Sequence, residues 1–291
     1  KVREWADSMK VKGFSKSMIQ NTLTCLQGAM NYAILPLKYI QANPCVAVKI
    51  GKMPMDMTAK AHTEYICSAE EFNQILKRFP ADNCFHLSLV VPYNTGTRIG
   101  ETFAIDLSQD VDFEKHELRI HGQMQKVEKT WYIKPPKYDS YRTIKMGETL
   151  EKELKFAIQQ RRINKLKYGG AYSKTYLLPD RSIAQIRADI DVPYKEILPL
   201  CVKENGALLT PDSFKYCARI IHYELNNPLF HAHCLRHTHG TILAENGVNP
   251  KTVMERLGHK DITTTLQTYT FNTDAMQQTA VDVFENAIQT Q

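Results

Sequence analysis

Four side chains near the end of the sequence combine residue types and spacing that suit chemistry on an anion. His233 and Arg236 are three residues apart, so a helix would place both on one face. His259 follows a Leu-Gly pair, and Tyr269 comes ten residues later. A guanidinium binds anions, an imidazole exchanges protons and a phenol can act as a nucleophile. Apolar packing does not require this set, so we expect the four side chains to share one pocket.

Short elements with clear boundary signals must position these residues. Asn249-Pro250 predicts a helix start, with Asn as the cap and Pro at the first helical position. Gly258 predicts the left-handed end of that helix, which leaves His259 just past it. Asp261 can cap a further short helix that carries Tyr269. The sequence therefore spreads the four side chains over three successive elements.

A second cationic site is predicted upstream, in the stretch 95–101. A short turn bracketed by glycines opens a helix there, and it places Arg98 where its guanidinium can reach an anion beside backbone N–H groups. Many helix starts contain an Arg, so this motif alone is a weak signal. Together with Arg236, it indicates a paired clamp. We expect Glu101, one turn further on, to orient a guanidinium rather than to react.

This arrangement resembles the catalytic domain of the tyrosine recombinases, the integrases of phages and conjugative transposons. Their pattern of Thr-Gly-x-Arg-x-x-Glu, His-x-x-Arg, Leu-Gly-His and a following Tyr is present over roughly residues 65–270. The family also has a Lys in a β-hairpin, five residues before an Arg. Lys137 and Arg142 keep that spacing, and Lys134 is the competing candidate. The resemblance implies a supporting role for Glu101 and these catalytic residues: Arg98, Lys137, His233, Arg236, His259 and Tyr269.

The resemblance also implies an α+β fold that is mostly helical, with a small antiparallel sheet. We expect a helical core-binding domain at 1–46, a linker at 47–65, a catalytic domain at 66–272 and a tail helix at 273–291. The chain starts inside a helical pattern at Lys1, so we expect a fragment that lacks the earlier core-binding helices. In the family such a tail often packs on a neighbouring protomer, and packing on its own domain is the alternative.

Within the catalytic domain, strands are predicted at 118–120, 131–133 and 142–144. The last two are expected to form a hairpin through residues 135–140. Residues 169–205 show no clear period and are expected to be irregular.

Breaking a phosphodiester requires a nucleophile, stabilisation of charge on the non-bridging oxygens and an acid for the leaving 5′ oxygen. The resemblance gives the first role to Tyr269, whose phenol has an ordinary pKa near ~10 and therefore needs cations around it. Lys137 would protonate the leaving oxygen. His233 would act as the base, and His259 would donate a hydrogen bond to a phosphate oxygen. The product would be a covalent 3′-phosphotyrosine, for which no cofactor is expected.

Composition permits a polyanionic partner without establishing one, since 37 Lys and Arg face 31 Asp and Glu, for a net charge of +6. The resemblance implies double-stranded DNA with attachment or recombination sites, a homo-oligomer that is a tetramer on DNA, and DNA-bending or excisionase helper proteins. Seven Cys without a CxxC pair favour a reducing compartment, and the resemblance implies the bacterial cytoplasm. No apolar run approaches the ~18 residues of a membrane span. The candidate DNA contacts are Lys49, Lys52, Lys60, Arg142, Lys215 and Arg219.

Three other interpretations account for parts of the sequence. A zinc site is suggested by the histidines and the cysteine between His231 and His239, but no HExxH motif or third ligand at fixed spacing occurs, and Arg236 would repel a cation. No metal is therefore expected. A type IB topoisomerase-like relaxing enzyme would use similar chemistry. A non-catalytic DNA-binding protein could share the fold.

Overall fold

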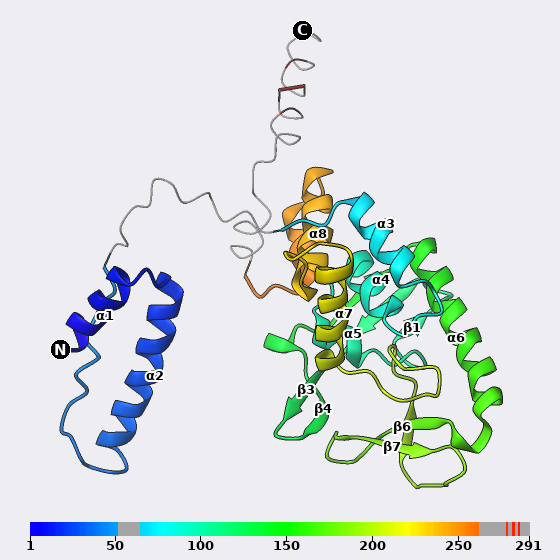
Figure 1. Ribbon diagram of the computed structural model, residues 1–291, viewed down its shortest axis with the longest axis horizontal. Coiled ribbons are helices and arrows are strands. Elements are labelled where there is room, and N and C mark those ends of the chain that lie inside the picture. Colours follow the sequence, from blue (N-terminus) through cyan, green and yellow to red (C-terminus); the bar gives the residue numbers. More distant parts are fainter. Residues whose placement is uncertain (52–64, 262–277, 279–280, 283–284, 286–291) are drawn as a thin grey trace. The chain divides into compact units, whose positions relative to one another are not determined.

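The computed structural model describes residues 1–51, 65–261, 278, 281–282 and 285 (Figure 1). The chain divides into two compact units, Lys1–Thr63 and Glu64–Gln291. The domain boundaries expected at 46, 65 and 272 stay predictions. Tyr269, the short helix expected around it and most of the expected tail helix lie outside the described residues, as do Lys52 and Lys60.

The first unit is built on two helices, α1 (Val2–Val11) and α2 (Lys16–Ile34). The Ser15 hydroxyl accepts a hydrogen bond from the Met18 backbone N–H and so starts α2. Ile19 and Leu23 point one way from α2 and are buried, as is Ala6 on α1. The two helices therefore pack against each other through apolar residues at helical spacing.

The second unit is mostly helical. Its first helix begins at a reciprocal cap: Ser68 accepts from the Glu71 backbone N–H, and the Glu71 carboxylate accepts from the Ser68 N–H. Ser and Glu three residues apart are the sequence signature of such a capping box. The helices are α3 (Ala69–Arg78), α4 (His86–Thr95), α5 (Ile99–Ala104), α6 (Glu148–Tyr168), α7 (Pro211–Glu224), α8 (Ala232–Glu245) and α9 (Pro250–Leu257), with short 3-10 turns at Lys137–Asp139 and Gly169–Ala171.

Three small antiparallel sheets complete the described part of this unit. Their strands are β1 (Val111–Asp112), β2 (Glu117–Ile120), β3 (Gln123–Val127), β4 (Thr130–Lys134), β5 (Arg142–Lys145), β6 (Ser173–Leu177), β7 (Ile183–Arg187) and β8 (Lys195–Ile197). The strand orders are β1-β2-β5, β3-β4 and β7-β6-β8.

Two expectations about strands are wrong. The segment 135–140 does not close a hairpin, because β4 pairs with β3 and β5 pairs with β2. Residues 169–205, expected to be irregular, contain the β7-β6-β8 sheet. Alternation along a strand shows which face is buried, but it does not show which partner the strand pairs with.

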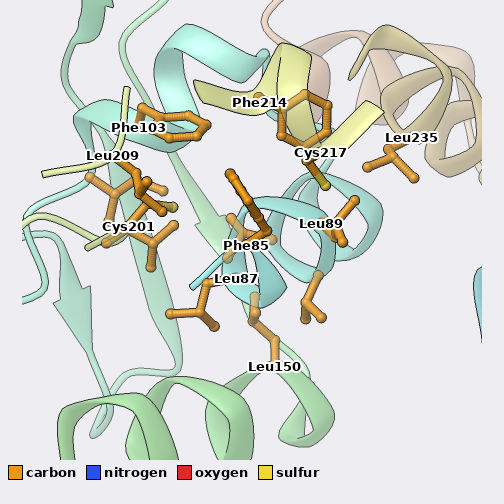
Figure 2. Packing of buried hydrophobic residues seen from close by; sticks show 14 of the residues in the cluster. Phe85, Leu87, Leu89, Phe103, Leu150, Cys201, Leu209, Phe214, Cys217 and Leu235 are labelled. Atoms are coloured by element: carbon orange, nitrogen blue, oxygen red, sulfur yellow. The ribbon is translucent and has the colours of Figure 1, made fainter. Parts of the chain in front are cut away.

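The core of the second unit surrounds α4, whose residues are buried along most of its length (Figure 2). Side chains from α5, α6, α7 and α8 close around it; the labelled examples are Phe103, Leu150, Phe214 and Leu235. Burying one such side chain contributes about 1.5–3 kcal/mol. The C-terminal end of α4 is therefore firmly held, and the Arg98 turn starts there.

The predicted α+β fold, mostly helical with small antiparallel sheets, is confirmed by the described residues. None of the helices in this part of the chain combines the length and the apolar content that crossing a bilayer takes.

Candidate active site

The turn that carries Arg98 is formed by Gly96, the left-handed cap of α4 with φ +68°. A Cβ at Gly96 would lie 2.3 Å from Leu257 Cδ2 on α9 and 2.9 Å from His239 Cδ2 on α8. Gly96 is therefore required both by its backbone conformation and by the close approach of two other helices. Arg98 then caps α5 in extended conformation, with φ −68° and ψ 151°.

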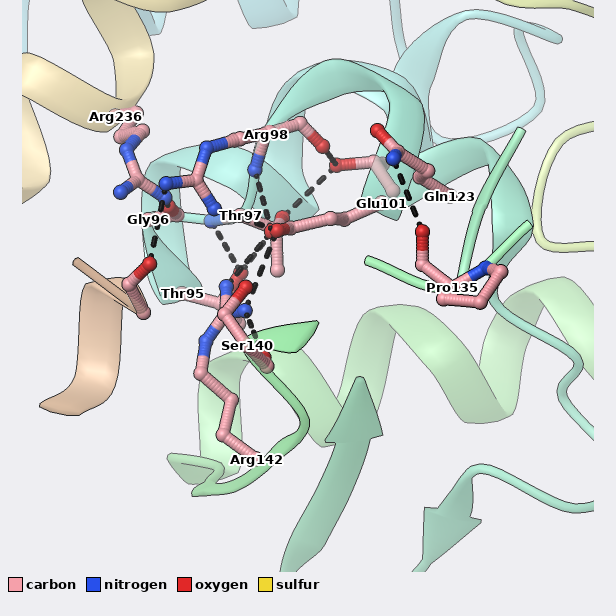
Figure 3. A network of polar contacts seen from close by, with 12 residues as sticks. Thr95, Gly96, Thr97, Arg98, Glu101, Gln123, Pro135, Ser140, Arg142 and Arg236 are labelled. Atoms are coloured by element: carbon pink, nitrogen blue, oxygen red, sulfur yellow. Dashed lines mark hydrogen bonds and ion pairs between the residues drawn. The ribbon is translucent and has the colours of Figure 1, made fainter. Parts of the chain in front are cut away.

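Glu101 lies between two guanidiniums (Figure 3). Its Oε1 accepts from Arg98 Nη1 over 2.8 Å, and its Oε2 accepts from Arg142 Nη2 over 2.7 Å. The Glu101 side chain is fully buried. Burial works to raise its pKa, but the hydrogen bond and charge of Arg142, with the charge of Arg98, outweigh burial and hold that pKa below its usual range. Glu101 is thus an ionised, buried support for both cations.

Arg142 and Arg98 also hold the C-terminal end of α9. Arg142 Nε donates to the Arg256 carbonyl over 2.8 Å, and Arg98 Nη2 donates to the Gly258 carbonyl over 3.1 Å. Helix ends expose carbonyls that lack partners within the helix and carry partial negative charge, so a guanidinium is a favourable cap. As predicted, α9 starts at an Asn249 cap and ends at Gly258 with φ +68°.

Arg236 reaches the same turn from α8. It is 1% exposed, and its Nη1 donates to the Gly96 carbonyl over 2.7 Å. Figure 3 shows its guanidinium beside Gly96, next to that of Arg98. The two arginines that the sequence predicted as a clamp are therefore connected through one turn.

Two histidines face these cations. Burial, then the charges of Arg236 and Arg98, lower the pKa of His233 to about 4. Burial and the same two charges, with Arg142, lower the pKa of His259 to about 3. His233 retains an exposed surface and His259 is half-buried, so solvent can reach the site. Both imidazoles are neutral at pH 7 and can accept or donate a proton.

The described contacts of Lys137 do not include the arginines or histidines of this cluster. It is exposed in the segment between β4 and β5, and its Nζ lies 4.9 Å from the ring centroid of the adjacent Tyr138. Lys134, the competing candidate, lies over the Tyr132 ring at 5.9 Å. The structure brings neither ammonium into contact with the arginines, so the catalytic lysine stays a prediction.

The candidate DNA contacts fall into two kinds. Lys49, Lys215 and Arg219 are exposed; Lys215 pairs with Asp212 over 2.8 Å, and Arg219 stacks on Tyr216. Arg142 differs, because Glu101, Ser140 and Arg256 take up its donors and its side chain is only 8% exposed. Arg142 therefore supports Glu101 and the end of α9, and its contact with DNA stays a prediction. The Lys-to-Arg spacing marked the residue in the sequence, but its partner lies 41 positions away.

Within the described residues, His, Cys, Asp and Glu side chains form no group of three able to hold a metal ion. His233 and His237 stack edge to face with centroids 5.0 Å apart. His239 bonds to the Tyr93 carbonyl and to Arg256.

Two arginines and two neutral histidines lie at one polar site of a helical domain. Such a site is suited to binding and transforming a phosphate group, and this chemistry defines the class of protein. Comparison with known proteins makes the class specific. A family model described as the phage integrase family matches residues 67–276. The chain therefore belongs to the phage integrase family, the tyrosine-type site-specific DNA recombinases.

Named relatives of the chain agree with this family membership. A "Tyrosine recombinase XerC-like" protein of Caldanaerobacter subterraneus subsp. tengcongensis is 26% identical over 98% of this chain and 70% of its own length. The "Transposase from transposon Tn916" of Enterococcus faecalis is 26% identical over 92% of this chain and 61% of its own length. A structure of the Tn1549 transposon integrase in complex with transposon right end DNA superposes with a TM-score of 0.65 and 25% identity, covering 97% of this chain and 83% of that one.

Proposed function

We propose that this protein is the integrase of a mobile element and that it cleaves and rejoins DNA through a covalent 3′-phosphotyrosine at Tyr269. The observation that carries the proposal is the hydrogen bond from Arg236 to the Gly96 carbonyl, which holds Arg236 against the turn that carries Arg98. This arrangement offers two guanidiniums to one phosphate, in a place fixed before DNA arrives. The family match and the Tn1549 likeness favour strand exchange over the relaxing and non-catalytic alternatives.

In the proposed reaction, the Tyr269 oxygen attacks the scissile phosphorus and its proton passes to neutral His233. The guanidiniums of Arg98 and Arg236 stabilise the charge on the non-bridging oxygens, where one donor is typically worth about 10²–10³ in rate. His259 donates a further hydrogen bond. The bond to the 5′ oxygen breaks, and that oxygen takes a proton from Lys137. Attack by a 5′ hydroxyl on the phosphotyrosine reverses these steps and joins strands.

We further propose that the partner is double-stranded DNA carrying the element's attachment sites, bound by a homotetramer together with DNA-bending or excisionase proteins. The relatives' solved complexes with DNA support the first part. The candidate DNA contacts are Lys49, Lys52, Lys60, Arg142, Lys215 and Arg219. Each neutralised phosphate should lower log affinity by about 0.9 per log unit of salt.

The test is a trapping experiment with duplexes drawn from the DNA flanking the gene. A nick placed just downstream of the cleavage position lets the short 5′-hydroxyl strand diffuse away, so the covalent complex accumulates. Wild type is expected to give a protease-sensitive band of retarded DNA on a denaturing gel, and Tyr269→Phe should give none. A wild type that binds these duplexes yet forms no covalent band would contradict the proposal.

A further inference from the structure

Arg256 connects the end of α9 to three other elements. Its Nε donates to His239 Nε2 on α8 over 2.9 Å. Its Nη1 donates to the Lys145 carbonyl at the end of β5, and its Nη2 donates to the Asn94 carbonyl in α4, each over 3.1 Å. One planar side chain therefore fixes the relative positions of four elements, a geometry that a guanidinium can satisfy and an ammonium cannot.

Each contact lies close in sequence to an arginine of the active site. The backbone of α4 continues into the Gly96 turn, β5 starts with Arg142, and α8 carries the residue that binds that turn. Asn94 lies four residues before Arg98, Lys145 lies three after Arg142, and His239 lies three after Arg236.

The hydrogen bond to His239 also fixes that ring. A guanidinium only donates, so Nε2 of His239 must be the unprotonated acceptor. Its Nδ1–H then donates to the Tyr93 carbonyl over 2.9 Å. His239 is thus held as a neutral tautomer between α4 and α9.

The backbone of Arg256 also takes part in these contacts, here as an acceptor of a hydrogen bond rather than a donor. Its carbonyl accepts from Arg142 Nε, and two residues later the Gly258 carbonyl accepts from Arg98 Nη2. The next residue is His259, whose backbone N–H bonds back to Met254. The last turn of α9, which ends just before His259, is therefore held both by the Arg256 side chain and by hydrogen bonds to its backbone carbonyls.

We infer that Arg256 is a positioning residue for strand cleavage: it sets the place of His259 relative to Arg98 and Arg236, without itself touching DNA. This inference rests on the proposed function. The three groups that accept hydrogen bonds from the guanidinium, two backbone carbonyls and an imidazole nitrogen, are all neutral. These contacts therefore position the neighbouring elements, and they do not neutralise a carboxylate.

The experiment measures the single-turnover rate of covalent-complex formation at saturating protein, together with DNA affinity and the thermal midpoint. Arg256→Lys keeps the charge and loses the three-way geometry. Arg161→Ala is the control for the loss of an arginine that donates to a backbone carbonyl elsewhere, because Arg161 donates to that of Leu200 over 2.7 Å but lies on α6. Misplacing catalytic groups by about 1 Å can cost about 10²-fold. We expect Arg256→Lys to slow cleavage about 10–100-fold with affinity within about 3-fold of wild type, and Arg161→Ala to keep the wild-type rate.

A double-mutant cycle with His259→Ala separates positioning from general destabilisation. If Arg256 acts through His259, then Arg256→Lys in the His259→Ala background should cost less than about 3-fold, because effects on groups that act as a unit are not additive. Equal rate losses in both backgrounds, or a loss no larger than that of Arg161→Ala, would overturn the inference while leaving the proposed function intact. A wild type without any covalent complex would overturn both.

Discussion

Nη1 of Arg236 donates to the carbonyl oxygen of Gly96 over 2.7 Å, although the two residues are 140 positions apart. This contact fixes a guanidinium from α8 against the turn that presents Arg98. The proposed anion site is therefore assembled by the fold of the free protein, and the entropy lost in ordering these side chains is lost during folding rather than during binding.

Gly96 should tolerate no side chain. In Gly96→Ala, a left-handed backbone costs about 1–2 kcal/mol and overpacking against Leu257 and His239 costs about 1–3 kcal/mol more. We expect the free energy of unfolding, from denaturant titration, to fall by the sum of these. Gly247→Ala is the control, because Gly247 has φ +71° but a Cβ added there would meet no described atom within 4 Å. Equal losses for the two variants would show that the contacts with α8 and α9 do not matter.

Replacing Glu101 with Gln should leave two guanidiniums facing each other without a carboxylate. Removing one partner of a buried ion pair typically costs about 3–5 kcal/mol, and we expect a loss of that size at pH 7 by denaturant titration. The exposed pair Arg78–Glu224 provides the control, and Glu224→Gln should cost much less.

The same variant has an expected pH signature. Because the pKa of Glu101 is lowered in the folded protein, its stabilisation is complete above the ordinary Glu value of about 4.3 and is lost as pH falls through the lower folded value. The difference between wild type and Glu101→Gln should therefore shrink in acid. A difference that stays constant down to the acid transition would contradict the ion pair.

Cleavage should show no titration near the ordinary His pKa of about 6.5. His233 and His259 have pKa values lowered to about 4 and about 3, so both are neutral throughout the range from pH 7.5 to 5. The second-order rate constant at limiting DNA reports groups of the free enzyme, and we expect it to be flat across this range. A decline centred near pH 6.5 would show that at least one of these imidazoles has an unperturbed pKa.

Local signals in the sequence predicted local structure well. The Asn249 cap and the left-handed Gly258 form as predicted, because each depends on backbone groups within a few residues. The paired Arg98 and Arg236 followed from motif resemblance together with these elements.

Long-range partners could not be read from the sequence. Arg142 is predicted as a DNA contact, and nothing near it in sequence identifies Glu101 as its partner in the fold. No motif or spacing in the sequence marked Arg256 as a positioning residue, since its partners on α4, β5 and α8 become neighbours only when the domain folds. The pairing of β4 with β3 was missed for the same reason.

The most direct test of the account identifies the residue that becomes joined to DNA. Trypsin cuts after Lys260, and no Lys or Arg follows it, so Tyr269 is the only tyrosine of the peptide 261–291. After trapping with a nicked duplex, nuclease and trypsin digestion, mass spectrometry should find this peptide carrying a 3′-linked nucleotide on Tyr269. A nucleotide attached to any other residue, or a trapped complex with this peptide unmodified, would contradict the account.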